Sequence, residues 1–536
     1  MNIRKLLHAS AIGTATILMA CTEMADRSTY DTSSASAPPA RYCCASARAS
    51  MPQSAYWDEG RESYPQFEDN PVRQVAEAPV STFSIDVDTA SYARMRRFLN
   101  DGLLPPPDAV RTEELVNYFP YDYRPPASRE QPFRAETALF DAPWDEGRQL
   151  LRIGIKGFDI PAVNRPPANL VFLIDTSGSM HSPDKLPLVQ RSLRMLVDEI
   201  GAEDRIALVT YAGSAGILLR PAKGIDTLSI LTAIDGLRAG GSTAGGAGIE
   251  LAYRLARENY RDGAVNRVIL ATDGDFNVGI SDPDRLEALI ASKRRSGIYL
   301  SVLGFGTGNL KDATMQRLAQ AGNGNAAYID SFQEARKVLV DELGSTLFPI
   351  ADDVKVQIEF NPAHVAEYRL IGYETRMLRR EDFNNDRIDA GEVGSGHTVT
   401  ALYEIVAPDS PARRVDPLRY AEEAPQEPAG AANGELAWLR IRYKLPGDSK
   451  SRLIEQPVLA AARTTFAAAP QDARFAAAVA GFGQLLRNSD MIGDFDWNDV
   501  LGIAHDAKGE DILGYRAEFN RLVGTAAGLA RLAAAQ

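Results

Sequence analysis

The stretch NLVFLIDTSGS, residues 169–179, decides the fold of this chain. Its first six residues form a nearly continuous apolar run, which is typical of a strand buried on both faces in a parallel sheet. Small polar residues follow from Asp175 to Ser179, and Gly178 allows the backbone to bend there. Because ligands of parallel α/β sheets bind at the carboxyl ends of the strands, a functional site is expected in this turn.

Strands and helices alternate after this stretch. The expected strands are 205–211, 268–271, 298–305 and 326–329, and the expected helices are 186–200, 244–257, 311–321 and 332–347, with another beginning at Asp282. Helix 186–200 places its apolar residues on one face, as an amphipathic helix does. The alternation predicts a doubly wound, mostly parallel, Rossmann-like α/β sheet over residues 168–350.

The regions on either side of this α/β unit have different patterns. Strand-like runs occupy residues 131–167 and 351–450, and they are expected to pair into one β-rich domain with the α/β unit inserted. Residues 79–130 predict an N-terminal α/β segment that begins with a strand. The last region, 451–536, is rich in alanine and predicts a helical C-terminal region.

Composition excludes several classes of protein. The chain has 536 residues, with 58 basic and 71 acidic side chains, so its net charge is −13. This balance argues against non-specific nucleic-acid binding, which needs clustered Lys and Arg. Three cysteines are too few for a disulfide framework or a cysteine-based zinc module. The five histidines lie far apart, so a histidine-rich catalytic metal site is not expected.

The N-terminus predicts export and a lipid anchor. Arg4 and Lys5 precede an apolar run that ends at Ala20, which predicts a signal peptide over residues 1–20. Cys21 follows in a context that resembles the bacterial lipobox, so Cys21 is the expected lipidation site. Thr22 stands in place of Asp, and its resemblance to the sorting rule of bacterial lipoproteins implies the outer membrane. The periplasmic side is the expected location, and the sequence leaves surface exposure open as the alternative. Residues 21–78 predict a disordered tether. No later segment approaches ~18 apolar residues, so the lipid is the expected membrane anchor.

Three loops at strand ends carry the residues for a cation site. They contain the DTSGS motif (175–179), GGST (240–243) and TDGD (272–275). The loops are expected to meet at one edge of the sheet, and they offer two carboxylates and three hydroxyls: Asp175, Asp273, Ser177, Ser179 and Thr243. All five are hard oxygen ligands, and only two of them are carboxylates. Such a set favours Mg²⁺, with Mn²⁺ and Ca²⁺ as alternatives.

Together the three motifs resemble the metal-ion-dependent adhesion site (MIDAS) of the von Willebrand factor type A (vWA) domain. The resemblance implies that Ser177, Ser179 and Thr243 bind the metal through hydroxyls, and that Asp175 and Asp273 act directly or through water. It also implies that an acidic side chain of a protein partner completes the coordination. Residues 81–119 and 494–523 resemble flanking regions of YfbK-like bacterial lipoproteins.

Other chemistries fit the motifs less well. A haloacid-dehalogenase phosphatase needs a second Asp where Ser177 stands, and serine does not transfer protons near neutral pH. A serine hydrolase would have a GxSxG motif, which does not surround Ser177. A phosphate-binding loop would have GK[ST], which does not follow the glycines at 240–248. The expected function is therefore a non-enzymatic, metal-dependent module on a lipid-anchored cell-envelope protein. It would bind an Asp or Glu of another envelope protein, and neither a small-molecule substrate nor nucleic acid. A structural scaffold with an unused metal motif and a metal-dependent hydrolase are the alternatives.

A second cation loop is a weaker hypothesis. Asp382, Asn384 and Asp386 match the first, third and fifth positions of a calcium loop. Arg387 replaces the glycine of the sixth position, and Val393 replaces the glutamate of the twelfth. A solvated acidic hairpin is the favoured alternative.

Overall fold

The computed structural model describes residues 64, 66–85, 88–241, 248–274, 282–306, 312–388, 390–416 and 434–534. All of them belong to one unit of the chain, residues 58–536. The predicted signal peptide, Cys21 and most of the tether lie outside the described residues, and so does Thr243.

The α/β region forms a six-stranded sheet in the order β10-β9-β8-β5-β6-β7. Its strands are β5 (Ala168–Asp175), β6 (Arg205–Tyr211), β7 (Ala215–Lys223), β8 (Val265–Thr272), β9 (Tyr299–Phe305) and β10 (Ala326–Ile329). All neighbours are parallel except β6 and β7, which pair antiparallel. The predicted doubly wound, mostly parallel sheet is therefore confirmed. Sequence analysis missed β7, because as an edge strand it is only partly buried and lacks a continuous apolar run.

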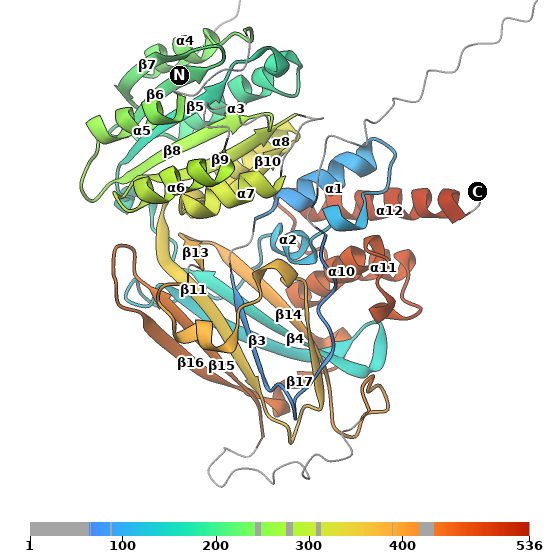
Figure 1. Cartoon of the computed structure of the whole chain (residues 1–536). Helices are drawn as coiled ribbons and strands as arrows, with labels where there is room; N and C mark the ends of the chain where they lie inside the picture. Colours follow the sequence, from blue (N-terminus) through green and yellow to red (C-terminus); the bar gives the residue numbers. More distant parts are fainter. Residues whose placement is uncertain are drawn as a thin grey trace, which may run out of the picture. The chain divides into compact units, whose positions relative to one another are not determined.

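Helices cover both faces of this sheet (Figure 1). They are α3 (Leu186–Glu199), α4 (Thr227–Asp235), α5 (Gly248–Glu258), α6 (Pro283–Arg294), α7 (Asp312–Ala321), α8 (Phe332–Arg336), which continues as a π-helical turn (Lys337–Asp341), and α9 (Leu343–Leu347). Successive residues of the central strand β5 point to opposite faces. Leu170 and Phe172 therefore join the core with α3, whereas Val171 and Leu173 join the core with α5, α6 and α7.

Segments on both sides of the α/β region build a second, six-stranded sheet. It contains β1 (Arg73–Gln74), β3 (Phe133–Ala142), β4 (Asp145–Gly157), β12 (Glu367–Ile371), β14 (Thr398–Val406) and β17 (Arg463–Thr464). Within it β4 pairs antiparallel with β14, so the strands before and after the α/β region form one sheet, as expected.

A third sheet lies beside it in the β-rich part of the chain (Figure 1). Its strands are β2 (Val80–Ser84), β11 (Pro349–Phe360), β13 (Gly391–Gly394), β15 (Glu435–Lys444) and β16 (Arg452–Leu459). The prediction that the chain is helical from residue 451 was wrong at its start. Residues 452–459 alternate in exposure and pair with β15. Their alternation favours a strand, whereas the alanine-rich composition that suggested a helix belongs to the residues after them.

Five helices from opposite ends of the described chain share one apolar core. They are α1 (Ala90–Asn100), α2 (Thr112–Asn117), α10 (Gln471–Leu486), α11 (Trp497–Asp506) and α12 (Tyr515–Ala534). Figure 1 shows α1 and α2 beside the C-terminal helices. The predicted helical C-terminal region is thus present from Gln471, and the N-terminal segment completes its core.

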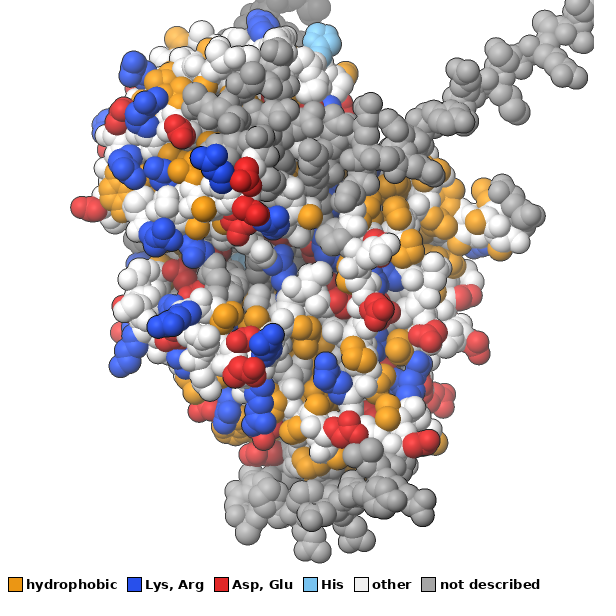
Figure 2. Space-filling model, in the orientation of Figure 1, with side chains coloured by type: hydrophobic (Ala, Val, Ile, Leu, Met, Phe, Trp, Pro, Cys, Tyr) orange, Lys and Arg blue, Asp and Glu red, His pale blue; other side chains and the backbone are white. Residues whose placement is uncertain are grey.

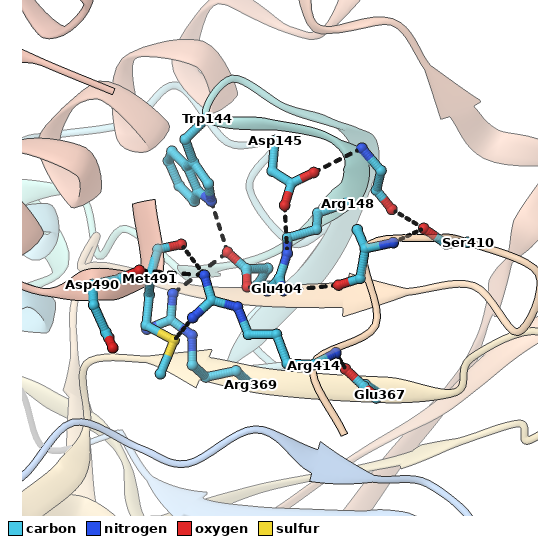
Figure 3. Close-up of polar contacts among 12 residues, drawn as sticks. Trp144, Asp145, Arg148, Glu367, Arg369, Glu404, Ser410, Arg414, Asp490 and Met491 are labelled. Carbon is cyan, nitrogen blue, oxygen red and sulfur yellow. Dashed lines mark hydrogen bonds and ion pairs between the residues drawn. The ribbon is translucent and has the colours of Figure 1, made fainter. Parts of the chain in front are cut away.

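A buried ion cluster joins these helices to the second sheet. Glu404 of β14 accepts a hydrogen bond from Trp144 Nε1 at 2.7 Å and pairs with Arg148 and Arg369 (Figure 3). Arg369 also donates to Gln484 Oε1 of α10 at 2.8 Å. Because each buried charge here has a partner, the cluster fixes α10 against the sheet without leaving an isolated charge.

Two carboxyl groups repel one another near α2: Glu113, which is buried, and Glu374, which is partly buried. Burial and the charge of Glu113 raise the pKa of Glu374 to about 8. Burial and the neighbouring Glu114 likewise raise the pKa of Glu113. Because the pKa of Glu374 is higher in the folded protein than its unfolded value of 4.5, the folded state binds more protons in this range. The free energy of unfolding therefore falls as the pH rises from 4.5 through about 8.

Glu374→Gln is therefore expected to flatten the fall in stability between pH 5 and pH 8.5. We expect the wild-type protein to lose about 1–2 kcal/mol more than the variant over this range, because Glu374 keeps part of its surface in water. Urea unfolding at both pH values measures this difference. The exposed Glu381→Gln is the matched control. Equal losses in the wild type and in Glu374→Gln would contradict the prediction.

Charges on the visible surface are mixed. On the face drawn in Figure 2, Lys and Arg side chains are interspersed with Asp and Glu rather than gathered by sign.

Candidate metal centre

The first loop of the candidate centre follows β5 directly. Asp175 is the last residue of the strand, and its Oδ1 accepts a hydrogen bond from the backbone N–H of Ser177 at 2.8 Å. The hydroxyls of Ser177 and Ser179 lie 2.9 Å apart. Asp175 and Ser177 are fully buried, whereas Ser179 is exposed. The loop therefore brings three of the predicted ligands together, and one of them faces solvent.

The second loop is hydrogen-bonded to the first. The backbone N–H of Gly240 donates to the carbonyl of Thr176 at 2.8 Å, and the N–H of Gly178 donates to the carbonyl of Gly241 at 3.2 Å. Gly241 has a φ of +95°, a conformation that favours glycine. Thr243 lies two residues further along, outside the described residues, so its role stays a prediction.

The third loop follows β8. Asp273 comes directly after the strand and is 1% exposed. Gly274 then turns the chain with a φ of +103°, and its N–H donates to Thr272 Oγ1 at 3.2 Å. Since β5 and β8 are parallel neighbours, Asp175 and Asp273 leave the sheet at the same edge. This is the edge at which the sequence predicted a site.

The electrostatics of this edge suit a cation. Burial, with a further contribution from the charge of Asp273, raises the pKa of Asp175 to about 6, although hydrogen bonds from Ser177 act in the opposite direction. Asp175 Oδ2 and Asp273 Oδ1 are buried and find no hydrogen-bond partner in the described part of the chain. Unsatisfied buried oxygens are costly, and a bound cation would satisfy both.

The donor set fits a hard divalent cation. Within the described residues, no three His, Cys, Asp or Glu side chains are grouped to hold a metal. A cation at this edge would therefore depend on the hydroxyls of Ser177 and Ser179 as well as on the two carboxylates. Few carboxylates combined with hydroxyls and water match the preferences of Mg²⁺.

Lys185 is a member of this site that sequence analysis missed. Its Nζ lies 2.8 Å from Asp273 Oδ2, and both side chains are buried. Lys185 directly precedes α3, which begins at the same edge of the sheet because it follows β5. The only signal in the sequence was a lysine six residues after Ser179, which belongs to none of the three motifs.

The predicted second cation loop makes other contacts. The carboxylate of Asp386 accepts hydrogen bonds from Arg442 at 2.9 Å and from Ser451 at 2.5 Å. Asp382 Oδ2 accepts from the backbone N–H of Arg379 at 3.2 Å, and Asn384 is exposed. A cation held by Asp382, Asn384 and Asp386 stays a prediction that these contacts do not favour.

The fold and the site define a class of protein. A doubly wound sheet with the buried Asp175 and Ser177 at the carboxyl end of β5, and the buried Asp273 at that of β8, is the arrangement of a vWA domain. Residues 169–341 match the family model of the von Willebrand factor type A domain, and residues 58–152 match the model described as von Willebrand factor. Residues 345–529 match the model of the C-terminal part of the uncharacterized protein YfbK.

The similarity of most of the chain to one bacterial protein identifies the family. The chain is 50% identical over 476 residues to the uncharacterized protein YfbK of Escherichia coli K12, which covers 88% of this chain and 82% of the relative. The chain therefore belongs to the YfbK family.

More distant relatives match shorter stretches. Human inter-alpha-trypsin inhibitor heavy chain H4 is 26% identical over 204 residues, which cover 36% of this chain and 22% of that protein. A solved von Willebrand factor type A protein from Catenulispora acidiphila aligns with a TM-score of 0.37 and 16% identity, covering 74% of this chain and 91% of that one. A TM-score this low supports no inference about function.

None of the described helices is both long enough and apolar enough to span a membrane.

Proposed function

We propose that this protein is a metal-dependent protein-binding module, anchored to the outer membrane through a lipid on Cys21 and facing the periplasm. A Mg²⁺ ion, with Mn²⁺ and Ca²⁺ as alternatives, is held by Asp175, Ser177, Ser179, Thr243 and Asp273. The pair of buried carboxylate oxygens without hydrogen-bond partners among the described residues is the observation that carries the proposal.

The partner offers an Asp or Glu side chain. Ser179 is exposed and its hydroxyl lies 2.9 Å from that of the buried Ser177, so a cation bound by both hydroxyls is reached from solvent on the side of Ser179. On a chain with a net charge of −13, a bound divalent ion supplies a local positive charge. Attraction of an acidic side chain then depends on the metal, which makes recognition both specific and switchable.

A structural scaffold is the second candidate. The ion pair of Lys185 with Asp273 already neutralises one carboxylate of the site, which is what a protein with an unused metal motif would need. The two candidates differ in one measurable property, since only the first requires a divalent ion for its interactions.

Crosslinking in cells tests the proposal. Envelope fractions containing the full chain are washed with either millimolar Mg²⁺ or EDTA and are then crosslinked. We expect a crosslinked partner that EDTA removes and added Mg²⁺ restores, because the metal supplies the bond to the partner's carboxylate. Asp262→Ala, an exposed aspartate just before β8 at the opposite end of the sheet, should behave like the wild type. Capture that persists in EDTA would contradict metal-dependent recognition and favour the scaffold.

A further inference from the structure

The side chain of Lys185 is aimed at the metal centre. Lys185 is 7% exposed, and its Nζ donates a hydrogen bond to Asp273 Oδ2 at 2.8 Å. The carboxylate of Asp273 is fully buried, so this contact is largely shielded from water and salt. A cation bound to Asp273 would have to share that carboxylate with the lysine.

A groove at Gly306 holds the stem of Lys185 in this direction. Gly306 directly follows β9 and has a φ of +75°, which favours glycine. A Cβ atom on Gly306 would lie 2.2 Å from Lys185 Cγ and 2.6 Å from Lys185 Cε. The absence of a side chain at Gly306 is therefore what makes room for the lysine.

The N-terminal segment supports this groove from outside the α/β region. The hydroxyl of Tyr328 in β10 donates to the carbonyl of Gly306 at 2.8 Å. The guanidinium of Arg97 in α1 donates in turn to the Tyr328 hydroxyl at 2.9 Å. Tyr328 and Arg97 are both buried. The lysine is thus held in place by contacts that extend from the metal centre to α1.

We propose that Lys185 is a resident counter-charge that competes with the metal. In the metal-free protein its ammonium group offsets the mutual repulsion of Asp175 and Asp273. When a divalent ion binds the same two carboxylates, the lysine repels it, because like charges that share a carboxylate interact strongly in a buried site. Lys185 therefore stabilises the metal-free protein and lowers its affinity for Mg²⁺. This inference rests on the proposed function.

Such a residue would make loading of the site responsive to the divalent-ion concentration around the protein. With the counter-charge present, the site stays folded without metal and fills only when the ion is abundant. Binding of an acidic partner would then follow the availability of the metal.

Calorimetric titration of the full chain with MgCl₂ tests this inference. Lys185→Met keeps the bulk of the stem over Gly306 and removes the charge, so it should bind Mg²⁺ at least about tenfold more tightly than the wild type. Its melting temperature in EDTA should be lower, and excess Mg²⁺ should restore it. Lys185→Arg keeps the charge and should retain the low affinity. Lys223→Met removes an exposed lysine at the other end of the sheet and should change nothing.

The outcomes separate this inference from the proposed function. If the wild type binds Mg²⁺ and Lys185→Met binds it no more tightly, the inference alone is overturned. If only Lys185→Met binds Mg²⁺, the inference is supported and the proposed function fails. If neither binds, both are overturned. Should Lys185→Met fail to fold in EDTA, Lys185→Gln supplies the same comparison, because it removes the charge but keeps an N–H donor at the end of the side chain.

Discussion

Asp175→Asn is expected to weaken Mg²⁺ binding by at least about 100-fold. Loss of a residue that only hydrogen-bonds to a metal ligand already costs about 10- to 100-fold in metal affinity, and loss of a carboxylate ligand should cost at least as much. The amide oxygen of asparagine can still accept the backbone N–H of Ser177, as Asp175 Oδ1 does at 2.8 Å. The loop should therefore keep its conformation. What the variant loses is one of the two carboxylates that are predicted to hold the metal.

The same variant makes a second, opposite prediction for the metal-free protein. The raised pKa of Asp175 shows that burial opposes its charge, so the uncharged asparagine should not lower the melting temperature in EDTA. Calorimetry with Mg²⁺ and thermal unfolding with and without EDTA measure both effects. Asp262→Asn, an exposed change at the far end of the sheet, is the control. Unchanged Mg²⁺ affinity in Asp175→Asn would exclude Asp175 from the centre.

Arg96→Ala is expected to lower the free energy of unfolding by about 3–5 kcal/mol, more than any other variant considered for stability. Arg96 in α1 is 2% exposed and pairs with three carboxylates, those of Asp330, Glu334 and Glu518. Its Nε lies 2.8 Å from Asp330 Oδ2, and its Nη2 lies 2.7 Å from Glu334 Oε2. Removing the guanidinium leaves buried negative charges without compensation, which is far worse than losing an exposed pair.

Urea unfolding with a matched arginine measures this effect. Arg194 pairs with Asp235, and both side chains are 49% exposed. Arg194→Ala should therefore cost less than about 1 kcal/mol. Adding Glu334→Gln to Arg96→Ala should restore part of the loss, because the double variant carries one fewer uncompensated charge. If Arg96→Ala is no less stable than Arg194→Ala, the buried cluster does not hold α1, α8 and α12 together.

Where the pattern in the sequence is local, the sequence predicted the structure well. The apolar run that becomes β5 is buried along its whole length, and the polar residues after it turn at the expected edge of the sheet. The hydrogen bonds between the first and second loops could be expected only in outline, because two segments more than 60 residues apart form them. The strand β7 escaped prediction for a different reason, since no strand of the described residues pairs with its outer edge and its residues are half exposed.

Residues of the site that lie outside the motifs required the tertiary structure. Lys185 looks like any helix-flanking lysine in the sequence, and only the close approach of Gly306 aims it at Asp273. Arg96 and Asp330 are separated by 234 residues, so no local pattern could pair them.

The sequence by itself determined the alternation of strands and helices and the placement of Asp175, Ser177, Ser179 and Asp273 at strand ends. These follow from periodicity and turn chemistry, which act over a few residues. Only the tertiary structure decided that β4 pairs with β14, that α1 completes the C-terminal helical core, and that a lysine stands beside the candidate metal centre. Those contacts join segments that are far apart in the sequence. They form only where the packing of the whole chain brings matching apolar surfaces and opposite charges together.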